Sequence, residues 1–226
     1  MREKTFSVII PTLNAQKTLP RCLEAISAAL PGAEVIIVDA HSNDSTVDIA
    51  TKKGAKVLLS ERGRGGQLNL GAHHSTGEIL LFLHSDTILP KDAATILQLY
   101  FTETKVHVGT FGLKFDYPHW LLGVYSRLSR LDSIWTRFGD QCIVVRKAFY
   151  NAIGRFPNST LFEDVCFLRE ARKHTKIYSF PREVVTSADR FVRNGIFRQQ
   201  VLNGWMFLRF LLGESPERLS QEYCRW

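Results

Sequence analysis

Cysteine is scarce in this sequence of 226 residues. The cysteines make no CxxC pair and no Cys/His spacing of the kind that binds zinc, so neither a disulfide framework nor a structural metal cluster is indicated. We expect reduced, mostly packed thiols at positions 22, 142, 166 and 224.

Long apolar runs are also lacking. No stretch reaches the roughly 18 to 20 apolar residues that a membrane-spanning helix needs. The N-terminal Met1-Arg2-Glu3-Lys4 leads directly into strand-like sequence, without the apolar region of a signal peptide. These two absences predict a cytoplasmic protein.

Runs of basic residues are absent as well, although the formal net charge is +7. A charge of this sign could serve nucleic acid, an anionic membrane surface or phosphorylated small molecules. Because the basic residues are spread along the chain, the sequence disfavours nucleic acid as a partner. The hydrophobic content of 45% and the charged content of 23% are those of a globular protein, which argues against disorder.

Strand-like and helix-like segments alternate in the first half of the chain. Strands are predicted over residues 6–10, where Pro11 ends the strand, and over 34–38, 57–59 and 78–83. Helices are predicted after the caps Thr18 and Ser45 and in the segment that ends at Gly77. Alternation of this kind predicts βαβ units and an α/β fold with a mainly parallel sheet.

The second half is less regular. Strands are predicted over 111–115 (half-buried), 143–145 and 177–187, and helices over 120–131, 148–153, 163–173 and 195–212. Neither repeats nor an obvious linker interrupt the chain, so a single domain is the simplest organisation.

Three carboxylates stand where chain geometry favours a ligand site. Asp39 and Asp86 each follow an apolar strand, and in a parallel sheet both lie on the same edge. Asp164 lies beside Glu163 at the start of a predicted helix, where backbone N–H groups favour negative charge. Each also has a structural interpretation, since Asp39 or Asp44 could cap the next helix and the other two could be ordinary helix-start acids.

The loop Arg62-Gly63-Arg64-Gly65-Gly66-Gln67 is a further candidate. Its glycines allow close backbone approach to a ligand, and its arginines suit phosphate. It matches neither the Walker A pattern nor the dinucleotide fingerprint. Taken alone, this loop is nearly as well explained as a solvated connection between two elements.

Together these segments resemble family 2 glycosyltransferases, which have the GT-A fold, a Rossmann-like mixed and mainly parallel sheet flanked by helices. The resemblance rests on residues 7–14, 35–39 with 42–46, 64–71 continuing to Gly77, His84-Ser85-Asp86 at the DxD position, Gly139-Asp140-Gln141 and Phe162-Glu163-Asp164. More narrowly, the chain resembles the compact, soluble bacterial branch associated with radical-SAM or selenoprotein-domain neighbours, in which HxD replaces DxD.

The resemblance implies an inverting, metal-assisted transfer of sugar from a nucleotide-diphosphate donor to an acceptor hydroxyl. It implies a nucleotide-binding half over about residues 1–90 and an acceptor-side half with C-terminal helices over about 91–226, in a single domain over 1–226. The implied site residues are Pro11, Thr12, Asn14, Asp39, Arg64 and Asp86 for the nucleotide sugar, Asp86 for a divalent metal (Mn²⁺ or Mg²⁺) and Asp164 as the catalytic base.

The chain departs from the family pattern at three places. His84 replaces the first Asp of DxD, and Ala15 stands where the family often has Glu. The QxxRW signature of processive members is absent, since Gln200 is followed by Val-Leu-Asn-Gly-Trp, which argues against a polysaccharide synthase. The substitution at His84 leaves a non-catalytic nucleotide-sugar-binding protein of the same fold as the alternative function.

Two aromatic segments, 120–122 and 205–210, have two interpretations. They could dock on a membrane as peripheral contacts, or they could pack under the sheet or form a homodimer contact, and packing or dimerisation is the favoured reading. The sequence identifies neither the acceptor nor the oligomeric state.

Overall fold

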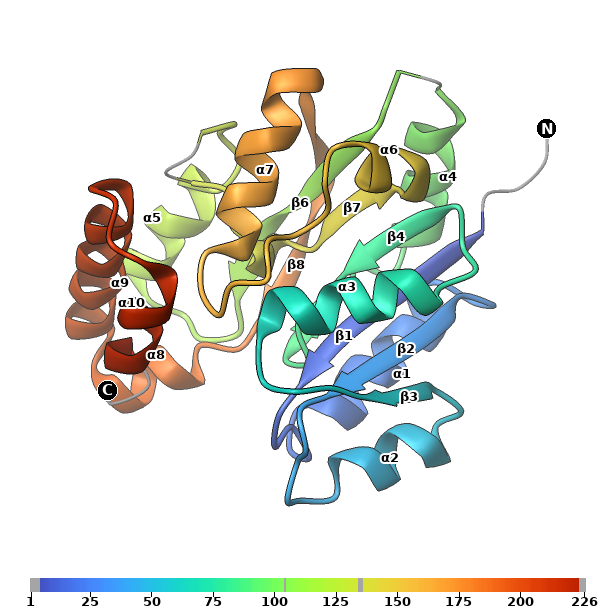
Figure 1. Cartoon of the computed structure of the whole chain (residues 1–226), viewed down its shortest axis with the longest axis horizontal. Helices are drawn as coiled ribbons and strands as arrows, with labels where there is room; N and C mark the ends of the chain where they lie inside the picture. Colours follow the sequence, from blue (N-terminus) through green and yellow to red (C-terminus); the bar gives the residue numbers. More distant parts are fainter. Residues whose placement is uncertain (1–4, 104, 134–135, 224–226) are drawn as a thin grey trace.

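The computed structural model describes residues 5–103, 105–133 and 136–223 (Figure 1). The strands are β1 (Phe6–Thr12), β2 (Glu34–Asp39), β3 (Lys56–Leu59), β4 (Ile79–Phe82), β5 (Thr87–Ile88), β6 (Val108–Phe115), β7 (Ile143–Arg146) and β8 (Ile177–Thr186). The helices are α1 (Leu19–Ala29), α2 (Thr46–Lys52), α3 (Arg64–His74), α4 (Ala93–Thr102), α5 (Trp120–Leu128), α6 (Lys147–Ala152), α7 (Glu163–His174), α8 (Asp189–Asn194), α9 (Ile196–Leu211) and α10 (Pro216–Tyr223), with a 3₁₀ turn, η1, at Gly139–Gln141.

Within the described residues, the strands form one 8-stranded sheet in the order β3-β2-β1-β4-β7-β6-β8-β5. The strands β3, β2, β1 and β4 are parallel, as the βαβ alternation predicts. β7 runs antiparallel to both β4 and β6, and β5 runs antiparallel to β8. The sheet is therefore mixed and mainly parallel, which confirms the predicted fold class.

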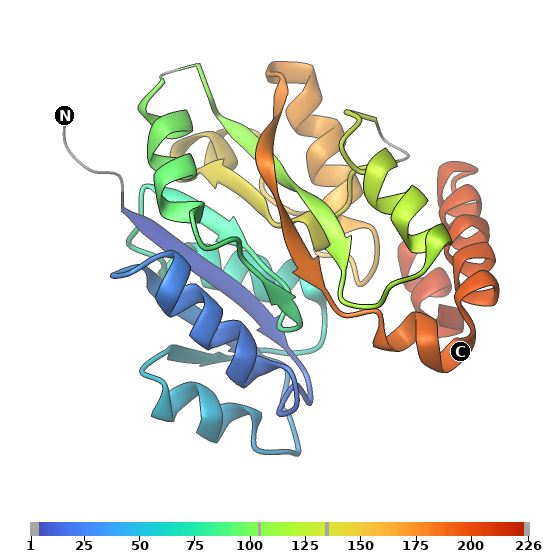
Figure 2. The same ribbon diagram turned by 180° about the vertical axis from the view of Figure 1, so that it is seen from behind.

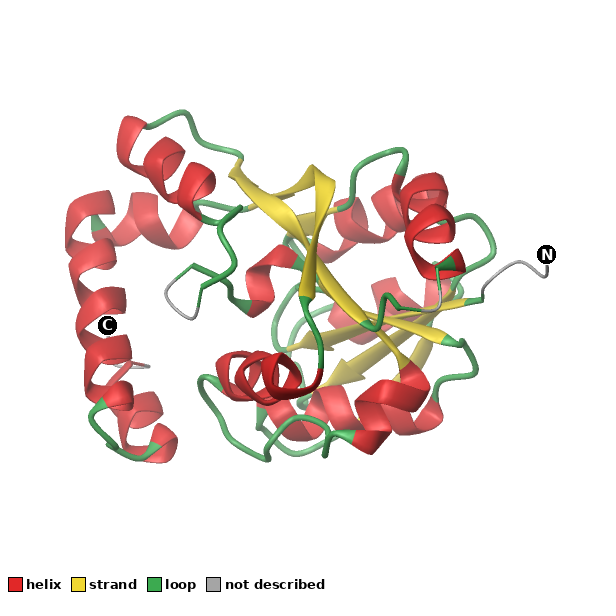
Figure 3. Ribbon diagram, turned by 90° about the horizontal axis from the view of Figure 1, so that it is seen from above, coloured by secondary structure: helices red, strands yellow, loops and turns green. Residues whose placement is uncertain are grey.

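Helices cover both faces of the sheet because successive side chains of its buried strands point to opposite sides. In β1, Val8 and Ile10 join the core beneath α1, α2, α4 and α5, whereas Ile9 joins the core beneath α3, α6 and α7. Figure 1 views the layer with α3, α6 and α7, and Figure 2 views the other layer from behind. The helices α8, α9 and α10 stand at one end of the molecule, beyond the sheet (Figure 3).

The structure corrects two predicted strands. Pro11 does not end the first strand, which continues to Thr12. Beyond Ile9, β1 pairs only with β2, so a residue without an N–H interrupts no hydrogen bond on the β4 side. β6 is not half-buried: only Lys114 is exposed, because the strand lies between β7 and β8 in the middle of the sheet.

Other predictions hold with shifted ends. The helix predicted up to Gly77 ends at His74, and the one predicted over 120–131 ends at Leu128. Cys22 and Cys142 are free and buried and Cys166 is free and half-buried, as expected, while Cys224 lies outside the described residues. In the described part of the chain, the helices are too short or too polar to cross a bilayer.

Candidate active site

The carboxyl ends of β1 and β2 bring Thr12 and Asp39 together. Asp39 Oδ2 accepts hydrogen bonds from Thr12 Oγ1 (2.8 Å) and from Ser42 Oγ (2.6 Å), and Oδ1 accepts one from the Ser42 N–H (2.8 Å). Its side chain is fully buried. Asp39 does not cap α2, because Asp44 accepts the Thr46 N–H at that helix start (3.0 Å).

Hydrogen bonds also tie the loops that follow β1 and β2. The exposed Asn14, with a left-handed φ of 52°, donates its N–H to Ser42 Oγ (2.7 Å) and accepts the Asn43 N–H (2.9 Å). From α3, the buried Gln67 donates to the carbonyls of Thr12 (3.2 Å) and Val38 (2.7 Å). Hydrogen bonds and strand pairing thus hold four residues together on the sheet edge, namely Pro11, Thr12, Asn14 and Asp39. We call these four residues the tied group.

The glycine-rich loop is mostly helix. α3 begins at Arg64, after Gly63 with a φ of 149°. Gly65 approaches another part of the protein rather than an open ligand site: a Cβ there would lie 2.0 Å from Pro157 O, and its N–H donates to Ser159 O (3.2 Å). The glycine therefore serves close packing of α3 against residues 157–159, and Arg64 alone points from this segment into the cavity described below.

Arg64 is the cation at the centre of an acidic cluster. Its Nε lies 3.0 Å from Glu163 Oε1, and its Nη2 lies 3.5 Å from His84 Nδ1. Burial lowers the pKa of Arg64, but the charges of Glu163, Asp164, Asp140 and Asp86 outweigh this effect and raise it overall. The guanidinium is therefore charged at every relevant pH.

His84 faces Arg64 from the loop after β4. Burial and the charge of Arg64 lower the pKa of His84 well below its usual value, so the imidazole is neutral at neutral pH. Asp86, two residues on, accepts hydrogen bonds from Thr87 Oγ1 (3.2 Å) and Thr186 Oγ1 (3.4 Å). Burial raises the pKa of Asp86.

Asp164 is held at the start of α7 by backbone donors. Its Oδ1 accepts the Val165 N–H (2.8 Å), and its Oδ2 accepts the Gly139 N–H. A Cβ at Gly139 would lie 3.0 Å from Asp164 Oδ2 and 3.3 Å from Arg64 Nη2, so only glycine leaves this approach unstrained. The helix-start interpretation is thus correct in part, but the same carboxylate also faces the cavity.

Two neighbouring acids, Asp140 and Glu163, have raised pKa values. Burial, with the charges of Asp164 and Asp86, raises the pKa of Asp140 to about 7, although Arg64 lowers it. Burial raises the pKa of Glu163 to about 7 as well, and Arg64 opposes this. In the described part of the chain, Asp140 Oδ1 and both carboxylate oxygens of Glu163 have no hydrogen-bond partner, so Glu163 is paired with Arg64 by charge alone.

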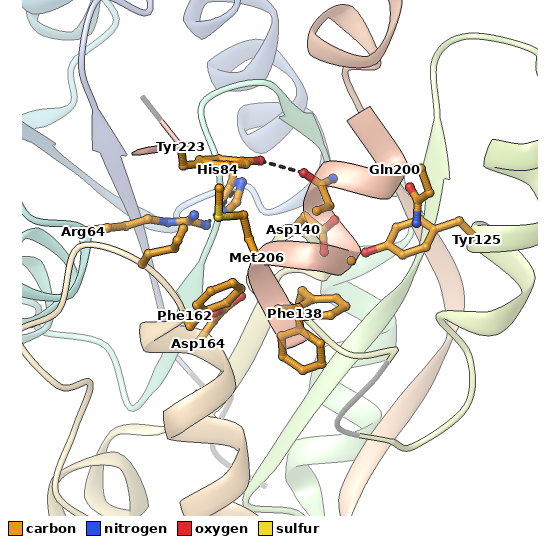
Figure 4. Close-up of a pocket in the computed structure, with 14 residues that line it drawn as sticks. Arg64, His84, Tyr125, Phe138, Asp140, Phe162, Asp164, Gln200, Met206 and Tyr223 are labelled. Carbon is orange, nitrogen blue, oxygen red and sulfur yellow. Dashed lines mark hydrogen bonds between the residues drawn. The ribbon is translucent and has the colours of Figure 1, made fainter. Parts of the chain in front are cut away.

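Most of these groups line one cavity of about 310 Å³ between the sheet edge and the C-terminal helices (Figure 4), although Asp86 and Glu163 do not. Its ionisable lining on the side of the sheet comes from Arg64, His84, Asp140 and Asp164. Tyr125 from α5, Phe138, Phe162, and residues of α9 and α10 enclose the other sides; the latter are Gln200, Asn203, Gly204, Met206, Phe207 and Tyr223. Tyr223 donates its hydroxyl to Asn203 Oδ1 (3.0 Å), which joins α10 to α9 over the cavity.

The cavity therefore collects Arg64 and Asp164 from the predicted site, while Asp86 lies in the surrounding charge cluster and Pro11, Thr12, Asn14 and Asp39 form the separate tied group. The resemblance placed Gly139-Asp140-Gln141 among the family's acceptor-side motifs, but Asp140 was not predicted to be a catalytic or binding residue. It also missed the lining residues of α9, whose helical spacing at Gln200, Asn203 and Phe207 is the signal that marks one face.

The negative charge of the described carboxylates around Arg64 favours a divalent cation, although their side chains do not form a preformed metal site. Asp86, Asp140, Glu163 and Asp164 surround Arg64, while His84 is neutral. Over residues 5–103, 105–133 and 136–223, no three or more His, Cys, Asp or Glu side chains are grouped to hold a metal ion. A cation bound through one or two carboxylates and the phosphates of a ligand does not need such a group.

Comparison with known proteins points to one family. The family model described as "Glycosyl transferase family 2" matches residues 7–152. The 4,4'-diaponeurosporenoate glycosyltransferase of Staphylococcus haemolyticus is 35% identical over 107 residues, which are 43% of this chain and 28% of that protein. The PGL/p-HBAD biosynthesis glycosyltransferase of Mycobacterium bovis is 37% identical over 97 residues, which are 39% of this chain and 38% of that protein. The chain thus covers well under half the length of these curated relatives.

Solved structures share the fold at low identity. The mannosyltransferase PcManGT of Pyrobaculum calidifontis, in complex with GDP-Man and Mn²⁺, has a TM-score of 0.64 at 20% identity, over 83% of this chain and 57% of that one. The glucosyl-3-phosphoglycerate synthase of Mycobacterium tuberculosis, in complex with Mn²⁺, UDP and glucosyl-3-phosphoglycerate, has a TM-score of 0.61 at 18% identity, over 81% and 71%. At such identity the likeness concerns the fold.

Proposed function

The chain belongs to glycosyl transferase family 2, and we propose that it moves a sugar from a nucleotide-diphosphate donor to an acceptor hydroxyl with inversion at the anomeric carbon. The observation that carries this proposal is the cavity where Arg64 and Asp164 meet at the carboxyl edge of the sheet. Ligands of open α/β sheets bind at this edge. The HxD at His84–Asp86 supports the narrower assignment to the branch with radical-SAM or selenoprotein-domain neighbours.

The nucleotide would bind over the tied group of Pro11, Thr12, Asn14 and Asp39, in the half that spans about residues 1–90. Structural neighbours whose complexes contain UDP or GDP-Man support a nucleotide ligand. Asp39 already accepts three hydrogen bonds, so its carboxylate has one further acceptor position for a hydrogen bond from the base of the nucleotide. Because Asp39 is buried, this contact requires the tied loops to shift locally.

The donor diphosphate would lie near Arg64 and Asp86. Arg64 offers a forked, permanently charged donor to phosphate oxygens. Asp86 would hold a divalent cation, Mn²⁺ or Mg²⁺, together with those phosphates, and the excess of carboxylates over cations supports this. When bound, the ion supplies Lewis-acid neutralisation of the diphosphate leaving group.

Asp164 would accept the proton of the acceptor hydroxyl. The two backbone N–H groups that it accepts stabilise the carboxylate and fix its orientation. The acceptor would enter the cavity beneath α9 and α10, in the half that spans about 91–226. A base on one side of the sugar and a leaving diphosphate on the other give in-line displacement, and hence inversion.

The test is a donor-hydrolysis screen with UDP-, GDP- and dTDP-sugars in the presence of Mn²⁺ or Mg²⁺. We expect turnover with at least one donor, and a loss of about 100-fold or more in Asp164→Asn, because general-base catalysis contributes about 10²–10⁴-fold. The control Asp48→Asn makes the same exchange at an exposed position of α2 and should keep full activity.

The alternative, a nucleotide-sugar-binding protein without turnover, rests on His84 in place of the first Asp of DxD. Tight nucleotide binding in calorimetry with no hydrolysis of any donor would establish that alternative and overturn the enzyme. The predicted absence of a nucleic-acid partner stays a prediction.

A further inference from the structure

Two helices at one end of the molecule expose large apolar side chains. On α5 these are Trp120, Val124 and Leu128, and on and just after α9 they are Phe197, Val201, Trp205, Leu208 and Leu212. We call these eight residues the α5–α9 face. Trp120 and Phe197 are each 73% exposed and Leu212 is 78% exposed, so these side chains are not core residues.

The exposed residues follow helical spacing. At about 100° per residue, the α9 positions from Phe197 to Leu212 fall within an arc of about 80°. The residues of α9 that line the active-site cavity, such as Gln200 and Phe207, lie on a different side of the same helix. Packing under the sheet, one half of the favoured sequence-based interpretation, therefore does not apply to Trp120 and Trp205, although Phe207 and Met206 are buried. The other half, a homodimer contact, stays a prediction.

The two stripes meet at their N-terminal ends. Trp120 of α5, Val192 of α8 and Phe197 of α9 line a shallow groove of about 430 Å³. Figures 1 and 3 show α5 and α9 at the same end of the molecule, away from β1–β3. The α5–α9 face thus joins elements that are about 70 residues apart in the sequence into one surface.

The charge on these helices identifies what the face can meet. α5 and α9 carry Arg127, Arg198 and Arg209 and contain no acidic residue. Arg127 and Arg198 are exposed beside the stripes, and Arg209 forms ion pairs with Glu214 and Glu222. In a symmetric homodimer through this face, arginines would approach arginines, which is unfavourable. A surface that is apolar inside and anionic outside satisfies both the apolar stripes and the arginines.

We propose that the α5–α9 face attaches the protein peripherally to anionic phospholipid bilayers. Tryptophan prefers the interfacial region of a bilayer, and arginines beside an apolar stripe reach the headgroups of anionic lipids. The attachment is independent of the proposed sugar transfer, since none of the eight residues lines the active-site cavity.

Vesicle co-sedimentation tests the proposal with the full chain. We expect binding to phosphatidylcholine vesicles that contain phosphatidylglycerol, weakening with added salt, and at least about tenfold weaker binding to phosphatidylcholine alone. The variant Phe197→Gln/Trp205→Gln/Leu212→Gln should lose about tenfold or more of the binding to anionic vesicles. The control Leu59→Gln/Leu99→Gln replaces leucines that are 59% and 69% exposed on β3 and α4, and it should bind like the wild type.

The possible outcomes of these experiments distinguish a bilayer from a second copy of the chain as the partner of the α5–α9 face. Equal vesicle binding by the triple variant, or no binding by the wild type, overturns the proposal. A wild-type dimer in sedimentation velocity that the triple variant abolishes, without vesicle binding, assigns the face to a second copy and also overturns it. Unchanged donor hydrolysis in the triple variant supports the proposal by showing that its loss of binding is not a loss of fold, and failure of the proposed function leaves the vesicle result intact.

Discussion

At the scale of single residues, the acids around Arg64 differ in what holds their charge. Asp164 accepts two backbone N–H groups, whereas Asp140 Oδ1 and the carboxylate of Glu163 have no hydrogen-bond donor among the described residues. A buried carboxylate without such donors tends to take up a proton. Asp140, whose pKa is raised to about 7, is thus suited to respond to pH.

The raised pKa of Asp140 predicts a pH-dependent stability. Asp140 titrates at about 7 in the folded protein, against 3.8 for the free side chain. As the pH rises from about 4 to 7, the unfolded chain loses this proton first, so stability is fully present below the lower value and is lost through this window. In metal-free buffer, Asp140→Asn should therefore be more stable than the wild type at pH 8 by roughly 1–3 kcal/mol, and about equal at pH 4.

Urea denaturation between pH 4 and pH 8 measures this difference. Because the pKa of Glu163 is also raised to about 7, the variant should lose part of the pH dependence rather than all of it. Identical slopes for Asp140→Asn and wild type would contradict the prediction, and Asp48→Asn should match the wild type throughout.

At the scale of elements, the start of α3 is fixed by its contact with the segment before α7. The N–H of Gly65 reaches Ser159 O, and Asn69, one turn later, donates to Phe156 O (2.9 Å). Tyr150 of α6 donates its hydroxyl to the same Asn69. This contact sets where Arg64 lies, and no spacing rule in the sequence predicts it because the partners are about 90 residues apart.

Two neighbouring glycines give a matched test of that contact. Gly65→Ala would place a Cβ 2.0 Å from Pro157 O, so we expect a loss of about 1–3 kcal/mol in the free energy of unfolding. Gly66→Ala meets nothing within 4 Å and lies in the same helix turn, so it should be neutral or stabilise by up to about 1 kcal/mol. Chemical denaturation of both variants measures the difference, and equal stabilities would refute the role of Gly65.

Some helices and strands could be predicted from the sequence, and others could not. The apolar runs that end at Asp39 and before Asp86 correctly predicted two parallel strands, β2 and β4, whose carboxyl ends lie on the same edge of the sheet on either side of β1. The strand β5 was missed because it has two residues and pairs with β8 about 100 positions away. α9 was predicted as a helix, but both of its sides carry apolar residues, so apolar periodicity alone did not separate the exposed side from the cavity side, which the polar Gln200 and Asn203 mark.

At the scale of the whole molecule, one continuous sheet joins the two proposed halves. β4 of the nucleotide half pairs with β7, and the core beneath α1 extends to Leu113 and Leu122 of the other half. Burial shared across both halves favours cooperative unfolding. The single domain over 1–226 stays our proposal, and the continuity of the sheet supports it.

The distribution of tryptophan makes cooperativity measurable. All 4 tryptophans of the sequence lie at position 120 or later, so their fluorescence reports only the acceptor-side half. Far-UV circular dichroism reports the helices and strands of both halves. We expect the two signals to change at the same urea concentration, whereas a fluorescence transition at lower urea would mean that the halves unfold separately.

The width of α9 sets how far a molecule must extend to reach from the exposed stripe to the cavity. An α-helix with its side chains is about 10–12 Å across, and the cavity and the exposed stripe lie on different sides of this one helix. When the α5–α9 face rests on a bilayer, the headgroups lie on one side of α9 and the cavity that Asp164 lines lies on another side of the same helix. A hydroxyl carried on a short tether could therefore reach the cavity without leaving the membrane, so search for the acceptor would become diffusion in two dimensions.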